Sequence, residues 1–135
     1  MSSNEHEMKV ITTPDCDNAP KKRVLKEFMI ACAEKDVDEI SLFITEKIEW
    51  SIVNEVVIQG RENFIHSLES KNPSKVEQLE ILNIITHGHT AAVNGTVSLE
   101  DGSVYSFCNV FRFVSAGKNV IKEITSYVLK NEENN

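Results

Sequence analysis

The stretch YSFCNVFRF, residues 105–113, alternates between two kinds of side chain. A period of two is the pattern of a β-strand whose two faces meet different surroundings. One face carries four aromatic side chains with an amide among them, and a plain core face needs no amide. We interpret this face as a pocket wall on which Asn109 is the orienting group. Its members are Tyr105, Phe107, Asn109, Phe111 and Phe113.

The sequence on either side of this stretch predicts an antiparallel meander. Asp101-Gly102 lies between alternating segments and is a strong hairpin signal. The segment SAGKN, residues 115–119, predicts the next turn. We expect strands at residues 76–87, 90–99, 103–115 and 119–130.

The first half of the chain predicts helices instead. Apolar residues recur at helical spacing between Asn18 and Glu34, with Asn18 as the expected cap and Pro20 in the first turn. A second helix is expected from Asp36, because Glu39 follows three residues later as in a capping box.

Two short strands and a third helix are expected before the meander, at residues 47–53, 55–60 and 61–69. Helices that come early and antiparallel strands that come late are typical of the α+β class. We expect one domain at residues 17–130, with flexible tails at residues 1–16 and 131–135.

The composition excludes several function classes. The chain has 135 residues and a net charge of −7, which argues against nucleic-acid binding and against anionic membrane surfaces. It has no apolar run long enough to span a membrane and no signal peptide pattern at its start. Its three cysteines are widely spaced, so we expect free thiols in the cytoplasm.

Several motifs in order resemble the nuclear-transport-factor-2-like superfamily, and within it the bacterial SnoaL-like proteins. They are FMIACAEKDVDEI (28–40), IEWSIV (48–53), IQGRENF (58–64), GSVYSFCNVFRF (102–113) and IKEITSYV (121–128). The resemblance implies a cone-shaped, cystatin-like fold, in which a curved antiparallel sheet wraps around a long N-terminal helix. It also implies a homodimer formed through the convex face of the sheet, where Cys108, Val110 and Val114 need a cover.

The resemblance does not carry over the catalytic residues of known members. At the positions that ketosteroid isomerases use, this chain has Phe28, Ile52 and Asn109. Phe28 donates no hydrogen bond and Ile52 takes no proton, so isomerase chemistry is not expected. Ser126 stands where epoxide hydrolases of this fold have their last aspartate. The matching of Asn94 and Thr96 to the other two positions is uncertain by one residue, and such a slip reverses their face.

The expected pocket is apolar and aromatic with a few polar groups, as is usual for small-molecule sites. We expect no cofactor and no metal, and the catalytic residues remain unknown. The predicted ligand-binding residues are Phe28, Trp50, Ile52, Asn94, Phe107, Asn109, Phe111, Ile124 and Ser126.

Each polar candidate also has a purely structural interpretation. Asn109 is either ligand-facing or a buried amide that a neighbour satisfies, and Asn94 beside Gly95 can mark only a bulge. His87 and His89 have the spacing of a metal-binding or proton-shuttling pair, but solvated turn histidines are the better interpretation. Cys108 lies on the face opposite Asn109 and is expected to be a small apolar side chain.

The leading hypothesis is therefore a protein that binds a small apolar molecule without an identifiable catalytic set. The first alternative is a SnoaL-like isomerase, cyclase or hydrolase with Asn109 and Ser126 as polar anchors. The second alternative is a dimerisation or protein-interaction domain. Nucleic acid and membranes are not expected as partners.

Overall fold

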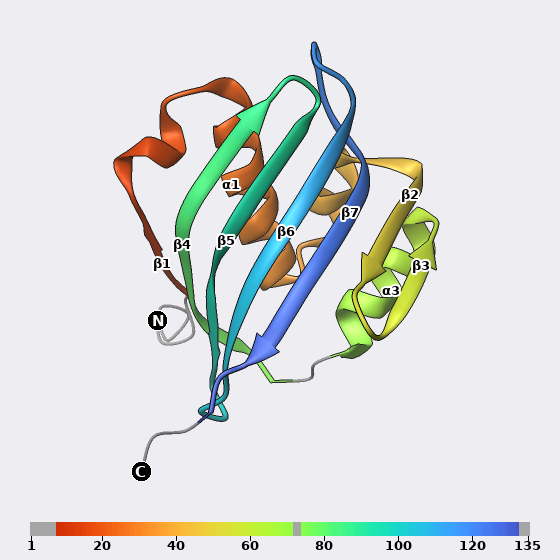
Figure 1. The fold of residues 1–135 in the computed structure, drawn as a ribbon. Helices are drawn as coiled ribbons and strands as arrows, with labels where there is room; N and C mark the ends of the chain where they lie inside the picture. The colour runs from red at the N-terminus through yellow and green to blue at the C-terminus, as the bar shows by residue number, and fades with distance from the viewer. Residues whose placement is uncertain (1–7, 72–73, 133–135) are drawn as a thin grey trace.

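The structure is a computed structural model that describes residues 8–71 and 74–132 (Figure 1). Its helices are α1 (Pro20–Glu34), α2 (Val37–Phe43) and α3 (Arg61–Lys71), with a short 3-10 helix η2 (Pro14–Asp17) before them. Its strands are β1 (Lys9–Thr12), β2 (Ile44–Ile52), β3 (Val56–Gln59), β4 (Val76–His87), β5 (Thr90–Leu99), β6 (Val104–Ser115) and β7 (Lys118–Lys130). No helix among the described residues is long and apolar enough to cross a membrane.

All strands belong to one sheet in the order β1-β4-β5-β6-β7-β2-β3. The predicted meander β4 to β7 is antiparallel, as expected. The prediction of a wholly antiparallel sheet is wrong at its two sides, because β1 pairs parallel with β4 and β2 pairs parallel with β7. In each parallel pair, helices and other strands lie between the two partners along the chain, and parallel strands need such a long connection instead of a tight hairpin turn.

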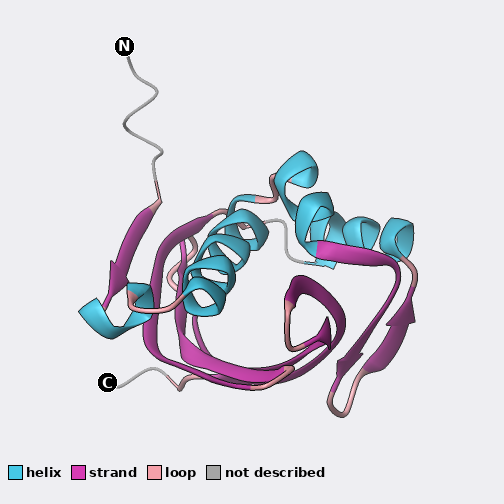
Figure 2. Cartoon of the chain, turned by 90° about the horizontal axis from the view of Figure 1, so that it is seen from above, coloured by secondary structure: helices cyan, strands magenta, loops and turns pink. Residues whose placement is uncertain are grey.

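The sheet curves around α1, which lies on its concave side (Figure 2). Leu25, Phe28, Met29 and Ala31 form the buried stripe of this helix. The Phe28 ring meets the Phe111 ring of β6 edge to face, with 5.9 Å between the centroids. Burying a side chain of this size contributes about 1.5–3 kcal/mol, so the stripe holds the helix against the sheet. The α+β architecture is as predicted.

The two helix starts differ in how well the sequence predicted them. Asp36 caps α2 as expected, and its carboxylate accepts a hydrogen bond from the Glu39 backbone N–H. The predicted cap of α1 is wrong, because Ala19 occupies that position and makes no side-chain cap bond. Asn18 instead ends η2, and Pro20 opens the helix, for which its fixed φ is suited.

The predicted N-terminal tail is structured in its described part. β1 pairs with β4, and Cys16 in η2 is buried in the core. The strand is held by a pairing partner far along the chain, which a local pattern does not reveal. Residues 1–7 of the predicted tail lie outside the described residues. At the other end Asn131 is hydrogen-bonded to Val104 and Ser106, and residues 133–135 lie outside the described residues.

Candidate functional site

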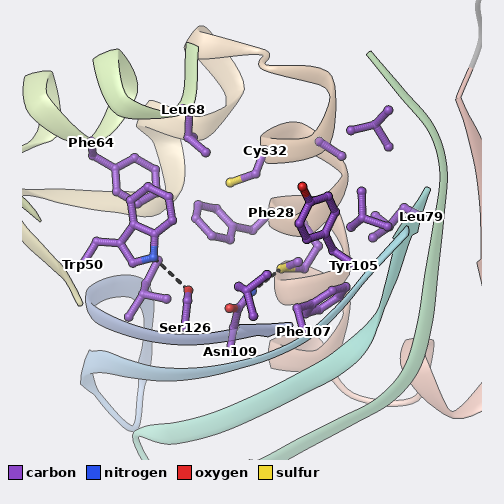
Figure 3. Close-up of a pocket in the computed structure, with 16 residues that line it drawn as sticks. Phe28, Cys32, Trp50, Phe64, Leu68, Leu79, Tyr105, Phe107, Asn109 and Ser126 are labelled. Atoms are coloured by element: carbon purple, nitrogen blue, oxygen red, sulfur yellow. Dashed lines mark hydrogen bonds between the residues drawn. The ribbon is translucent and has the colours of Figure 1, made fainter. Parts of the chain in front are cut away.

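A cavity of about 210 Å³ lies between the C-terminal half of α1, the helix α3 and the concave face of the sheet. We call it the inner cavity. Figure 3 shows its wall, to which α1, β2, α3 and the meander strands all contribute. Its lining is Phe28, Met29, Cys32, Ala33, Trp50, Phe64, Leu68, Val76, Leu79, Val97, Tyr105, Phe107, Asn109, Ile124, Ser126 and Val128.

Trp50 and Ser126 form the polar corner of the inner cavity. The Trp50 Nε1–H donates a hydrogen bond of 2.8 Å to the Ser126 Oγ (Figure 3). The parallel pairing of β2 with β7 brings these side chains together. On its other side the indole packs against the Phe64 ring of α3, with 4.8 Å between the centroids. The indole is thereby held by both a strand and a helix.

Asn109 lies directly across the β6–β7 ladder from Ser126. Its Nδ2 donates to the Met29 Sδ at 3.5 Å, and a thioether is a weak acceptor. Its flanking residues on the same face, Phe107 and Phe111, are buried. The amide is therefore a polar group on an aromatic wall, and among the described residues its side chain makes one weak hydrogen bond.

Cys32 of α1 supplies a thiol to the same cavity. Burial raises the pKa of this thiol well above its ordinary value, because the charged thiolate would be poorly solvated there. A protonated thiol is a poor nucleophile. Cys32 therefore acts as a small apolar side chain at neutral pH.

The inner cavity opens into a wider outer cavity of about 450 Å³ that shares several of its residues. Charged side chains occur only in this outer part, where Lys35 and Glu55 line the wall. Ile52 and Leu99 also belong to the outer wall. Lys35 and Glu55 thus line only the part of the space that the inner cavity does not share, and the wall of the inner cavity itself is uncharged.

Of the nine predicted ligand-binding residues, six line the inner cavity and a seventh, Ile52, lines the outer one. The six are Phe28, Trp50, Phe107, Asn109, Ile124 and Ser126. The structure brings them together from α1, β2, β6 and β7.

The two remaining predictions, Asn94 and Phe111, are placed elsewhere. Phe111 faces inward but is fully buried against Phe28, so it belongs to the core below the cavity. Asn94 pairs with Cys108 on the opposite face of the sheet, and it accepts a hydrogen bond from the Asn83 side chain. Its neighbours Val93 and Gly95 face inward instead, which is the one-residue reversal expected of a strand.

The sequence pattern did not predict that α3 lines the cavity. Its contributions are Phe64 and Leu68. Phe64 is buried and Leu68 is partly buried. What the pattern did not indicate is that α3 covers the end of the sheet next to Trp50. Tyr105, in contrast, also lines the cavity, and it belongs to the alternating face of β6 that the sequence pattern indicated as a pocket wall.

The other candidates are outside this site. His87 and His89 are exposed at the turn between β4 and β5. Within residues 8–71 and 74–132 no group of three His, Cys, Asp or Glu side chains is placed to hold a metal ion. Cys108 faces the convex side, partly buried, as the alternation predicted.

No family model matches the sequence, and no curated protein is a significant match. Solved structures do match over most of the chain. A protein of unknown function from Burkholderia xenovorans, described as NTF-2 like, shares 19% identity over 85% of this chain and 87% of its own, with a TM-score of 0.70.

The chain has the nuclear-transport-factor-2-like fold. Two enzymes also match this structure. The epoxide hydrolase/cyclase-like enzyme SalBIII shares 20% identity over 84% of this chain and 93% of its own, with a TM-score of 0.68. An epoxide hydrolase from Mycobacterium tuberculosis shares 19% identity over 79% and 80%, with a TM-score of 0.66. The nuclear-transport-factor-2-like fold thus hosts different functions, and the site must decide among them.

Proposed function

We propose that this protein binds a small, apolar molecule in the inner cavity. The observation that carries the proposal is the lining itself, which is aromatic and aliphatic with a few neutral polar groups. Such concave apolar walls with sparse polar groups are the usual character of small-molecule sites. The seven predicted residues that line the inner or outer cavity are the proposed contact residues.

An enzyme with this fold is the alternative, favoured by the names of the two enzymes that match. It would use Asn109 and Ser126 as polar anchors for a small apolar substrate. The inner wall has no carboxylate and no histidine, and its ionisable groups are the Tyr105 phenol and the protonated Cys32 thiol. For this reason we place binding ahead of catalysis. In the enzyme alternative, Asn109→Leu abolishes turnover and leaves the fold intact.

Native mass spectrometry of freshly purified protein tests the binding proposal. The expected result is an extra mass of a small molecule that is lost on denaturation. Trp50→Ala removes one side of the cavity and should strongly reduce the retained mass, whereas Val57→Ala on the exposed edge strand should leave it unchanged. If no mass is retained and apolar probes leave Trp50 fluorescence unaltered, the proposal is wrong.

We further propose that the protein is a homodimer in the cytoplasm. Apolar side chains on the convex face, among them Ile85, Tyr127 and Leu129, are exposed in the single chain. A second copy is the cover that this face needs. All three cysteines are free, which fits a reducing compartment.

A further inference from the structure

The inner cavity has a neutral wall, and this limits the charge of what it holds. None of its lining residues is Asp, Glu, Lys, Arg or His. The raised pKa of the Cys32 thiol keeps that group uncharged as well. A carboxylate or ammonium group inside would lose its hydration without gaining a counter-charge. Charged molecules are therefore selected against.

Ser126 has a hydrogen-bond donor to spare. Its side chain is almost completely buried, with only 4% of the residue exposed. An indole N–H can only donate, so the bond from Trp50 occupies a lone pair of the Ser126 oxygen and leaves its hydroxyl hydrogen uncommitted. The hydrogen bond from Trp50 fixes the position of the Ser126 Oγ on the cavity wall. The hydroxyl hydrogen can still rotate about the Cβ–Oγ bond toward an acceptor.

The Asn109 amide provides a second neutral polar group beside this hydroxyl. The two residues face each other directly in the β6–β7 ladder. Side chains so paired have Cβ atoms about 4.5–5.5 Å apart. The weak bond from Asn109 to Met29 is readily exchanged for a better acceptor. A carbonyl oxygen has two lone pairs and accepts from both groups.

The volume of the inner cavity sets the size of the molecule that this cavity can hold without reaching into the outer one. A cavity of about 150 Å³ holds a benzene ring. By proportion, 210 Å³ accommodates about eight or nine non-hydrogen atoms. This corresponds to one six-membered ring with a few substituent atoms.

We propose that the inner cavity selects an uncharged, ring-sized apolar molecule with one carbonyl oxygen, and that the Ser126 hydroxyl, positioned by the Trp50 indole, is the donor that selects it. This inference rests on the proposed function. It adds the chemical class of the ligand and the residue that recognises it, Ser126. Asn109 is the second donor to the same oxygen. The apolar body of the ligand lies against Phe28, Phe64 and Phe107.

The test uses three probes of matched size and the full chain. They are 4-methylcyclohexanone, its hydrocarbon counterpart with a methylidene group in place of the oxygen, and cyclohexanecarboxylate. Trp50 is the only tryptophan and lines the cavity, so its emission reports binding. In the native protein the ketone should bind at least about tenfold more tightly than the hydrocarbon, which is the effect of the two neutral hydrogen bonds from Ser126 and Asn109. The carboxylate should not bind measurably.

Ser126→Ala should reduce this preference by about three- to fivefold, because Asn109 alone then donates to the ketone oxygen. The matched control is Thr125→Ala, which removes a hydroxyl from the same strand on the opposite face and should leave the preference unchanged. The ratio of the two dissociation constants is the readout, because a general loosening of the fold alters both. If circular dichroism shows Ser126→Ala unfolded, Ser126→Cys replaces it and should reduce the preference, since a thiol is a weaker donor.

The outcomes separate this inference from the proposed function. Equal affinity of the native protein for ketone and hydrocarbon would leave the binding site in place and overturn the role of Ser126. A preference that is unchanged in Ser126→Ala would overturn it as well. Binding of none of the probes would contradict both the proposed function and the inference.

Discussion

At the scale of single residues, the Trp50–Ser126 hydrogen bond links the two halves of the chain. The partners are 76 residues apart in sequence, and the bond is 2.8 Å long. Ser126 is the buried polar residue of the described core, so its oxygen requires a donor. Trp50 supplies that donor and a large apolar surface together.

Trp50→Phe should destabilise the protein by about 1–3 kcal/mol in urea denaturation, because it removes the hydrogen bond and leaves a smaller ring against Phe64. Ser126→Ala should have a similar effect. In the double variant the loss should be smaller than the sum, since each single change removes the same bond. Circular dichroism follows the unfolding of each variant in urea. If the losses of the two single variants add up in the double variant, the bond does not stabilise the fold.

At the scale of elements, an irregularity in β4 shapes the concave face. The register between β4 and β5 shifts between Ile81 and Asn83, and Gly95 lies opposite Ile81. A Cβ atom built at Gly95 would overlap the backbone carbonyl of Glu80. The close approach of two backbones therefore requires glycine here, as is usual for bulges and bends in strands.

Gly95→Ala should destabilise the protein by about 1–3 kcal/mol or more, because backbone atoms cannot move aside as a flexible side chain can. The matched control is Gly117→Ala in the β6–β7 turn, where an added Cβ meets no atom within 4 Å. That change should stay within about 0.5 kcal/mol of the native protein. Thermal and urea melts measure both. Equal effects of the two changes would contradict the close approach.

The turn between β5 and β6 makes stability depend on pH. The Asp101 carboxylate accepts hydrogen bonds from the Ser103 backbone N–H and the Ser74 hydroxyl, and the Ser103 bond is the main cause that lowers its pKa below 3.8. A lowered pKa in the folded state means that this stabilisation is present above the ordinary carboxyl pKa. It is lost as the pH falls through the lowered value.

Asp101→Ala should therefore be less stable than the native protein at pH 7, and the difference should narrow as the pH falls below about 4. Urea denaturation at a series of pH values measures it. A difference that stays constant down to pH 2 would show that the charge of Asp101 is not its cause.

At the scale of the whole molecule, the two faces of the sheet have different roles. The concave face holds α1 and the cavity, whereas the convex face presents apolar side chains outward. Ile85 is 64% exposed and Leu129 is 73% exposed in the single chain. These residues are the basis for the proposed homodimer.

Ile85→Glu should convert a dimer to a monomer, because a second copy would have to bury the new charge. Sedimentation or light scattering should show half the native mass. Val57→Glu is the matched control, since Val57 is similarly exposed on the edge strand β3 rather than on the convex meander. A native protein that is already a monomer would contradict the dimer.

The sequence by itself determined most of the elements of this protein, though not β1 and η2. Strands β4 and β5 lie where alternation and turn residues predicted them, and α2 begins at its predicted Asp36 cap. These features depend on neighbours a few residues away, so the local pattern contains them. The aromatic wall with Asn109 on β6 was predicted for the same reason.

Only the tertiary structure decided how these elements meet. The parallel pairings of β1 and β2 join segments that are far apart in sequence, and no local pattern encodes such a partner. The face of Asn94 depends on register, in which a shift of one residue reverses every side chain. The bond from Trp50 to Ser126 and the cover that α3 provides arise from the same long-range packing. The cavity is therefore a property of the assembled sheet and helices, whereas several of its lining residues could be predicted from the sequence.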